Sequence, residues 1–118
     1  MATDPMEALR RARGEFTRGL PDRLTKIRDA LTALQQGFDG KHAEQFHVAS
    51  HALTGMAATF EAHEMAECAH SLSVLGRRWR KGGAATPVEM EDARRLVGRL
   101  DAAVTAFVTG EMADSPDE

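Results

Sequence analysis

Apolar side chains recur every three or four residues through most of the chain, and this spacing constrains its fold more than any other feature. The clearest run is Leu20, Leu24, Ile27, Leu31 and Leu34. At about 100° per residue, such a run forms one stripe along an α-helix. Similar runs predict helices over about 41–60, 64–80 and 87–109, and no segment has the alternation typical of a strand. The sequence therefore predicts an all-α fold.

Short stretches rich in glycine and proline separate the periodic segments. The Gly-Phe-Asp-Gly stretch at 37–40 and the Lys-Gly-Gly stretch at 81–83 are typical of turns, and the Thr-Pro-Val-Glu stretch at 86–89 is typical of a capping box. Helices joined by short turns bury their stripes against one another. We therefore expect an antiparallel up-down-up-down four-helix bundle over residues 21–109.

The two ends of the chain are expected to lie outside this bundle. The Gly-Leu-Pro sequence at 19–21 predicts a break and a new helix start. Residues 4–19 would then form an additional N-terminal lid helix that caps one end. Gly110 is expected to end the last helix, and 111–118 to form a short, frayed, acidic tail.

Length and composition limit the classes of function. The 118 residues suit a single domain, 1–118, and 42% hydrophobic content is ordinary for a globular protein. No apolar run approaches the roughly 18–20 residues of a membrane span, and the N-terminus lacks the apolar segment of a secretory signal. A net charge of −3 and 5% aromatic residues argue against nucleic acid as a partner. We expect a cytoplasmic protein, and the lack of a second apolar face predicts a monomer.

His51 lies on the side of its helix opposite to the predicted core. With Phe46, Leu53 and Phe60 on the inner face, the imidazole falls about 160° away, on the outer face. Its neighbours on that face include His47, Val48, Gly55 and Ala58. The sequence thus predicts an exposed imidazole on a rigid element, flanked mostly by small side chains, as expected for a reactive group that is presented to a partner.

The sequence His51-Ala52-Leu53-Thr54-Gly55 resembles the H-x-L-K-G signature of histidine-containing phosphotransfer (HPt) domains. The resemblance extends to the Leu-Pro-Asp-Arg-Leu sequence at 20–24, to the small residues Ala57 and Ala58, and to the tight turn before the helix that contains Cys68. In that family, a four-helix bundle carries one phosphorylatable histidine between a sensor kinase and the receiver domains of response regulators.

The resemblance implies that His51 is the phosphorylated nucleophile. It also implies that the receiver supplies the acidic pocket and Mg²⁺, so that the chain needs no cofactor or metal of its own. An imidazole suits this role because its unperturbed pKa near 6.5 leaves it largely neutral near pH 7. Two positions depart from the family pattern: Thr54 replaces the usual lysine, and Glu61 replaces a common glycine. The lysine contributes positive charge near the phosphoryl group.

Three further residues are candidates for a supporting role. Gly55 removes bulk where a partner must close over the imidazole, although it can also be a tolerated helical glycine. If the helix turn is centred near Ala62, Ser73 lies level with His51, where family members often have a glutamine. The Ser73 hydroxyl would orient the imidazole or bind a phosphoryl oxygen, or it is a serine on a solvated flank.

Arg77 lies one turn beyond Ser73 and belongs to a basic cluster with Arg78, Arg80 and Lys81. It can replace the charge of the missing lysine or meet the acidic pocket of a receiver. A solvated helix end, favoured by the helix dipole, is the alternative interpretation of the cluster.

Two other classes of function remain open. His47 and His51, at i and i+4 with Glu44 a turn before, have the spacing of a divalent-metal site, although His70 and Glu67 do not clearly converge on them. A non-catalytic bundle would instead bind a receiver or kinase through a docking patch without phosphotransfer. That patch is Val48, Ala52, Gly55 and Ala58, beside His47.

An enzyme with its own catalytic centre is disfavoured, because no glycine loop for phosphate and no nucleophile elbow is present in the sequence. The single cysteine, Cys68, excludes an internal disulfide and is predicted to be a buried thiol.

Overall fold

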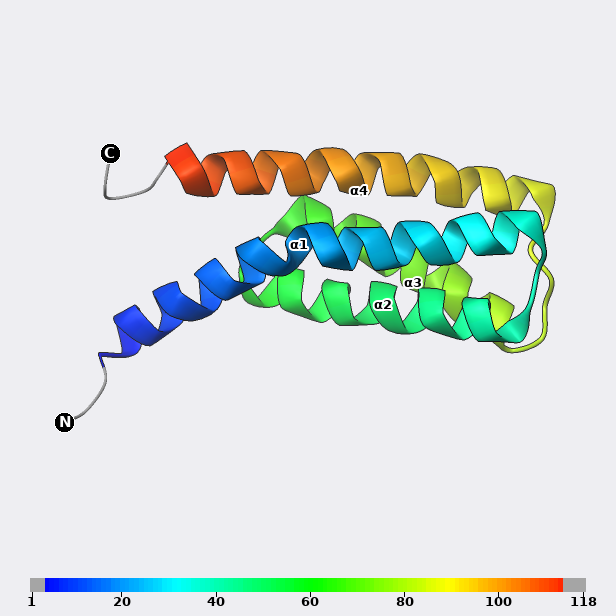
Figure 1. Cartoon of the computed structure of the whole chain (residues 1–118), viewed down its shortest axis with the longest axis horizontal. Coiled ribbons are helices and arrows are strands. Elements are labelled where there is room, and N and C mark those ends of the chain that lie inside the picture. The colour runs from blue at the N-terminus through cyan, green and yellow to red at the C-terminus, as the bar shows by residue number, and fades with distance from the viewer. Residues whose placement is uncertain (1–3, 114–118) are drawn as a thin grey trace.

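The computed structural model describes residues 4–113, which form four α-helices joined by short loops (Figure 1). The helices are α1 (Pro5–Gln36), α2 (Gly40–Thr59), α3 (His63–Arg80) and α4 (Pro87–Ala113). No strand occurs within residues 4–113. The predicted all-α fold is therefore confirmed.

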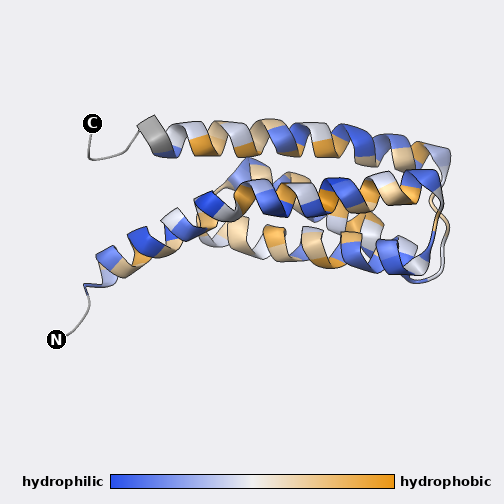
Figure 2. Ribbon diagram, in the orientation of Figure 1, coloured by the Kyte–Doolittle hydropathy of each residue, from blue (hydrophilic) through white to orange (hydrophobic). Residues whose placement is uncertain are grey.

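Each helix packs against the next one along the chain, and α1 also packs against α4, which closes a bundle around one interior. Figure 1 shows consecutive helices running in opposite directions, with the N-terminal part of α1 projecting beyond the bundle. Apolar and polar residues alternate around each ribbon (Figure 2). The apolar faces meet in the interior, and the whole run from Leu20 to Leu34 that defined the periodicity is buried.

The break predicted at 19–21 is wrong, because α1 is one continuous helix that contains Pro21. Proline removes one backbone hydrogen bond and kinks a helix, and Figure 1 shows α1 changing direction between its blue and cyan parts. Pro21 is exposed, while Leu20 and Leu24 are buried on either side of it and hold the helix in the core. Residues 4–19 therefore extend a bundle helix and do not form a separate lid.

The helix end predicted at Gly110 is also wrong, because α4 continues to Ala113. Glu111 forms an ion pair with Arg13 of α1. The Arg13 guanidinium also donates to the Phe60 carbonyl at 3.2 Å and lies 5.1 Å from the centre of the Phe107 ring. These contacts attach the last turns of α4 to the bundle. Residues 114–118 of the predicted tail lie outside the described residues.

The turn between α2 and α3 is tight and has a Schellman motif. The backbone N–H of Ala62 donates to the Ala57 carbonyl at 2.8 Å, and that of Glu61 donates to the Ala58 carbonyl at 3.1 Å. Glu61 has a φ of 59°, in the left-handed region that favours glycine. A glycine, as expected here from the family resemblance, would adopt this backbone conformation without strain, whereas Glu61 adopts it at a cost.

The capping box predicted before α4 is present and extends to α3. The Thr86 backbone N–H donates to Glu89 at 3.0 Å, and the Glu89 backbone N–H donates to the Thr86 hydroxyl at 3.1 Å. The buried Glu89 carboxylate also accepts from the Trp79 indole at 3.4 Å and pairs with Arg78 at 2.8 Å. The hydrogen bond from Thr86 lowers the pKa of Glu89, with smaller effects in the same direction from Trp79 and Arg78, against the opposing effect of burial.

We expect Glu89→Gln to lower the free energy of unfolding by about 1–2 kcal/mol near neutral pH. Because the folded pKa lies below the ordinary one, this stabilisation is present above the ordinary glutamate pKa and is lost as the pH falls through the folded value. Denaturant unfolding at a series of pH values measures the difference between wild type and variant. Glu91→Gln, at an exposed carboxylate, is the control. A difference of constant size down to strongly acidic pH would contradict this role of the charge.

Candidate phosphotransfer site

His51 is exposed on the outer face of α2, and its ring forms no hydrogen bond or ion pair with another residue in 4–113. The opposite face of the helix is fixed in the core by Phe46 and Leu53, which are 0% and 1% exposed. Burial of that face sets the direction of the imidazole, because each residue turns the helix by about 100°. The nucleophile candidate is therefore accessible on a helix that cannot rotate.

The two residues that follow in the motif differ in their surroundings. Thr54 is half-buried, and its hydroxyl donates to the Ser50 carbonyl at 2.8 Å, so it points along its own helix. Gly55 is exposed, and a Cβ added there meets nothing within 4 Å. The surface next to His51 is thus open at Gly55 and carries no charge at Thr54.

Ser73 lies at the expected level of α3, but its hydroxyl does not reach His51. It is buried and donates to the His70 carbonyl at 2.8 Å. The Ser73 main-chain carbonyl instead lies 3.1 Å from Nδ1 of His47. The His47 ring is half-buried and stacks on the His51 ring, with a centroid separation of 5.8 Å and an interplanar angle of 17°. The structure thus pairs His51 with His47.

The sequence matches one known protein family over most of its length. A family model described as the Hpt domain matches residues 11–110 of the 118-residue chain. The chain belongs to the Hpt domain family. No curated protein and no solved structure matched it. The match covers nearly all of the helical bundle, and it places the protein in phosphorelay signalling, in which Hpt domains interact with kinases and response regulators.

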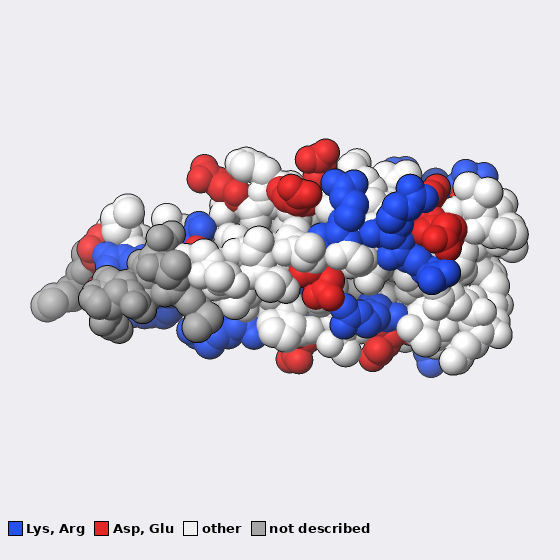
Figure 3. Space-filling model, turned by 90° about the horizontal axis from the view of Figure 1, so that it is seen from above, with Lys and Arg blue, Asp and Glu red and all other residues white. Residues whose placement is uncertain are grey.

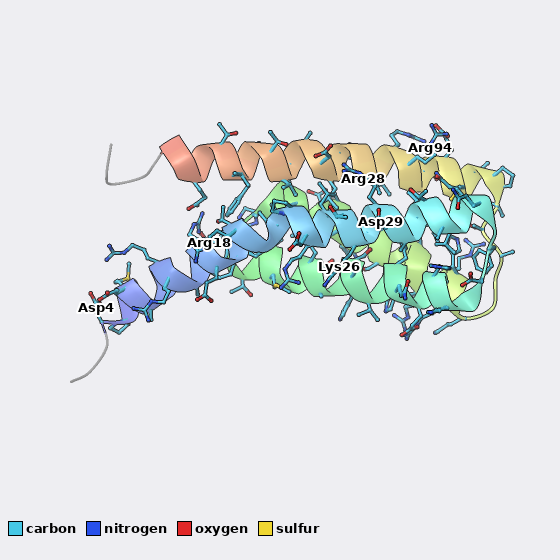
Figure 4. All side chains as sticks on the ribbon, viewed as in Figure 1. Asp4, Arg18, Lys26, Arg28, Asp29 and Arg94 are labelled. Carbon is cyan, nitrogen blue, oxygen red and sulfur yellow. The ribbon has the colours of Figure 1, made fainter. Side chains whose placement is uncertain are left out.

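The predicted docking patch of this Hpt domain is open to solvent. Val48 is 52% exposed, Ala58 is exposed, and Ala52 is half-buried. On the side of α1, the patch continues into a groove between α1 and α2. The groove is lined mainly by Val48, Ala49 and Ala52 from α2 and by Arg23, Lys26 and Asp29 from α1. Figure 4 shows Lys26 directed toward α2.

Lys26 and Arg23 did not emerge from the sequence as site residues. The two residues lie three positions apart on α1, and this spacing is a weak indication of a basic surface. The sequence does not show that this surface lies beside Val48 and Ala52, because that depends on how α1 packs against α2.

The basic cluster of the Hpt domain divides into paired and unpaired charges. Arg78 pairs with Glu89 at 2.8 Å, and Arg80 pairs with Glu44 at 3.2 Å. Arg77 and Lys81 are exposed and form no ion pair with a residue in the described range. By contrast, the face seen in Figure 3 carries interleaved basic and acidic side chains. On α4, Arg94 pairs with Glu91 and Arg95 pairs with Asp92.

Two of the three residues of the alternative metal site, Glu44 and His47, are engaged elsewhere. Glu44 pairs with Arg80, and Nδ1 of His47 faces a carbonyl oxygen. Among residues 4–113 there is no group of three or more potential metal ligands. Cys68 is buried as predicted, and burial raises the pKa of its thiol. Within the same residues, no helix is long and apolar enough to cross a membrane.

A glycine of α3 brings this helix unusually close to α2 at His47. A Cβ added to Gly76 would lie 2.8 Å from the Cα of His47 and 3.0 Å from its Cβ. Real Cβ atoms essentially never lie 2.8 Å from a backbone atom, so one helix would have to move. The sequence analysis did not identify Gly76, although it follows the small residues Ala69 and Ser73 on the same side of α3.

We expect Gly76→Ala to destabilise the bundle by about 1–3 kcal/mol through overpacking, although alanine is the better helix former. The matched control is Gly98→Ala in α4, where an added Cβ meets nothing within 4 Å. That variant should gain up to about 1 kcal/mol. Equilibrium unfolding in denaturant, followed by circular dichroism, measures both. Equal stability of the two variants would contradict the close approach of α2 and α3.

Proposed function

We propose that this Hpt domain is a phosphoryl carrier that accepts a phosphoryl group on His51. It would pass the group between a sensor histidine kinase and the aspartate of a receiver domain. The observation that carries the proposal is the exposed, unbonded imidazole of His51, on a helix whose other face is locked in the core. The imidazole occupies the histidine position of the motif that resembles the HPt signature.

The chemistry requires little more from this chain than positioning. The lone pair of a ring nitrogen forms a bond to phosphorus as the bond from phosphorus to the donor breaks, and the reverse step returns the group to an aspartate oxygen. Phosphoryl transfer depends mainly on in-line placement and charge stabilisation. In our proposal, the receiver supplies Mg²⁺ and the acidic pocket, and the Hpt domain supplies the nucleophile.

The docking patch and its basic borders suit such a partner. Small side chains at Ala52, Gly55 and Ala58 let a second protein approach the imidazole closely. Lys26 on one flank and Arg77 on the other carry positive charge toward an acidic pocket. A cytoplasmic, monomeric state remains a prediction from the sequence.

We expect His51→Gln to remove all acid-labile, alkali-stable phosphate that the wild-type protein takes up from a phosphorylated receiver or an active kinase. Glutamine has no nucleophilic ring nitrogen, and the exposed position should tolerate it without loss of stability. Radiolabel transfer measures the uptake, and His63→Gln, at the start of α3, is the control. Undiminished label in His51→Gln would refute the proposal. Binding of partners without any label in wild type would favour the docking-only function.

We expect Gly55→Glu to slow transfer at least about tenfold, because it adds bulk and negative charge where an acidic pocket must close over His51. The fold should persist, since the position is open. The control is Gly98→Glu, which makes the same change at an equally open helical position on α4. Transfer kinetics and thermal unfolding of the two variants test this. Normal transfer by Gly55→Glu would show that the partner docks on another face.

A further inference from the structure

His47 is the second imidazole of the site and is held more firmly than His51. Its Nδ1 lies 3.1 Å from the Ser73 carbonyl oxygen. A carbonyl oxygen only accepts a hydrogen bond, so Nδ1 carries the proton. The neutral tautomer with a proton on Nδ1 and the imidazolium both donate from this atom. His47 can therefore gain or lose a proton on Nε2 without losing its anchor.

The backbone of His47 is fixed as well as its ring. Gly76 allows α3 to approach so closely that a single added carbon would lie 2.8 Å from the His47 Cα. The buried residues Phe46 and Ser50 hold the adjacent turn of α2 in the core. The backbone that carries the His47 ring is therefore fixed by the packing of α2 against α3 and against the core.

The His51 ring is exposed, and its one aromatic contact in the described structure is the stack on His47. The separation of 5.8 Å is within the range at which aromatic rings attract each other. An exposed side chain on a helix otherwise samples several rotamers. An anchored neighbouring ring reduces that freedom, and in-line attack depends on the direction of the ring nitrogen.

His47 is the ionisable side chain that contacts His51, because the charged residues around it are paired, exposed or on another side of α2. Glu44, three residues earlier, is paired with Arg80 of α3. Arg77 follows Gly76 on α3 and is exposed. The charged residues of α1 next to α2 (Arg23, Lys26 and Asp29) line the groove on its other flank, and α4 does not pack against α2. A phosphoryl group brings close to two negative charges, and Thr54 offers no positive one.

We propose that His47 is a positioning residue for phosphotransfer at His51. Its anchored ring holds the His51 ring in the stacked orientation, and its protonated form places a positive charge beside the phosphoryl group. The proposal rests on the phosphoacceptor role of His51. It adds a second residue on which the rate of phosphorylation depends.

The test uses phosphoramidate, a small donor that needs no protein partner. Its phosphorus–nitrogen bond breaks with release of ammonia as the new bond to the His51 ring nitrogen forms. Phosphorus NMR gives the rate from about pH 5 to pH 8, the range in which histidines titrate. The His51→Gln variant gives the background from other histidines. The comparison is wild type against His47→Gln, which keeps an N–H donor but removes the ring and its charge. The control is His63→Gln.

We expect the wild-type rate to exceed the His47→Gln rate about tenfold at the acidic end of this range. There the positive charge of the His47 imidazolium lies a few ångströms from the negative phosphoryl group. The ratio should fall toward the alkaline end, where that positive charge is lost. The ratio for His63→Gln should stay near one. A ratio within about twofold of one at every pH would overturn the proposal. A large ratio that does not change with pH would overturn the role of the charge and support that of the stacked ring.

A second measurement separates this proposal from the proposed function. In the wild type, nuclear Overhauser contacts between the two rings should be present, and His47→Gln should shift the His51 ring signals. Absence of the contacts would overturn the stack. If His51 of the wild type takes up no phosphate above background, the proposed function fails. If it is phosphorylated and the ratio stays near one, only the role of His47 fails.

Discussion

The burial of one face of α2 determines what the site can do. Phe46, Ser50 and Leu53 are almost fully excluded from solvent. Because the helix turns by about 100° per residue, their burial forces His51 and Gly55 to the outer face. A rotation that hid the imidazole would expose Leu53 and forfeit roughly 1.5–3 kcal/mol for that side chain alone. The hydrophobic core thus orients the His51 imidazole without any polar contact to it.

The two flanks of α2 differ, and the difference organises the surface around His51. On the α3 side the helices are in their closest contact, and Gly76 meets the backbone of His47. On the α1 side the packing is looser and leaves a groove that contains Lys26. One flank therefore supplies rigidity to the pair of imidazoles, and the other supplies a depression beside the small residues of the docking patch. A partner that closes over His51 would meet both.

Much of this fold follows from the sequence, because the apolar period alone defines the helices, their inner faces and the outward direction of His51. The errors arose where packing outweighs local preference. Pro21 is tolerated because Leu20 and Leu24 are buried on either side of it. The helix α4 continues beyond Gly110, where Glu111 forms an ion pair with Arg13, a residue far away in the sequence. Periodicity carries no information about such contacts.

The same limit applies to the site. The geometry of the turn predicts which residue of α2 lies opposite Ser73, but it does not predict which acceptor its hydroxyl binds. In the structure the hydroxyl donates to the His70 carbonyl of its own helix. The contact of Gly76 with His47 depends on how closely two helices approach. A row of small residues on one side of α3 permits that approach without requiring it.

The replacement of lysine by Thr54 changes how charge reaches the site. A lysine one turn after the histidine, on the same helix, would keep its place whatever the other helices did. In this chain the candidate cations, Arg77 and Lys26, lie on α3 and α1, and Lys26 lines the groove beside the patch. Their distance from His51 depends on helix packing, so the electrostatics of the site are a property of the assembled bundle. A change in the core that shifts α2 against its neighbours would therefore alter the charge around His51 as well as the stability of the fold.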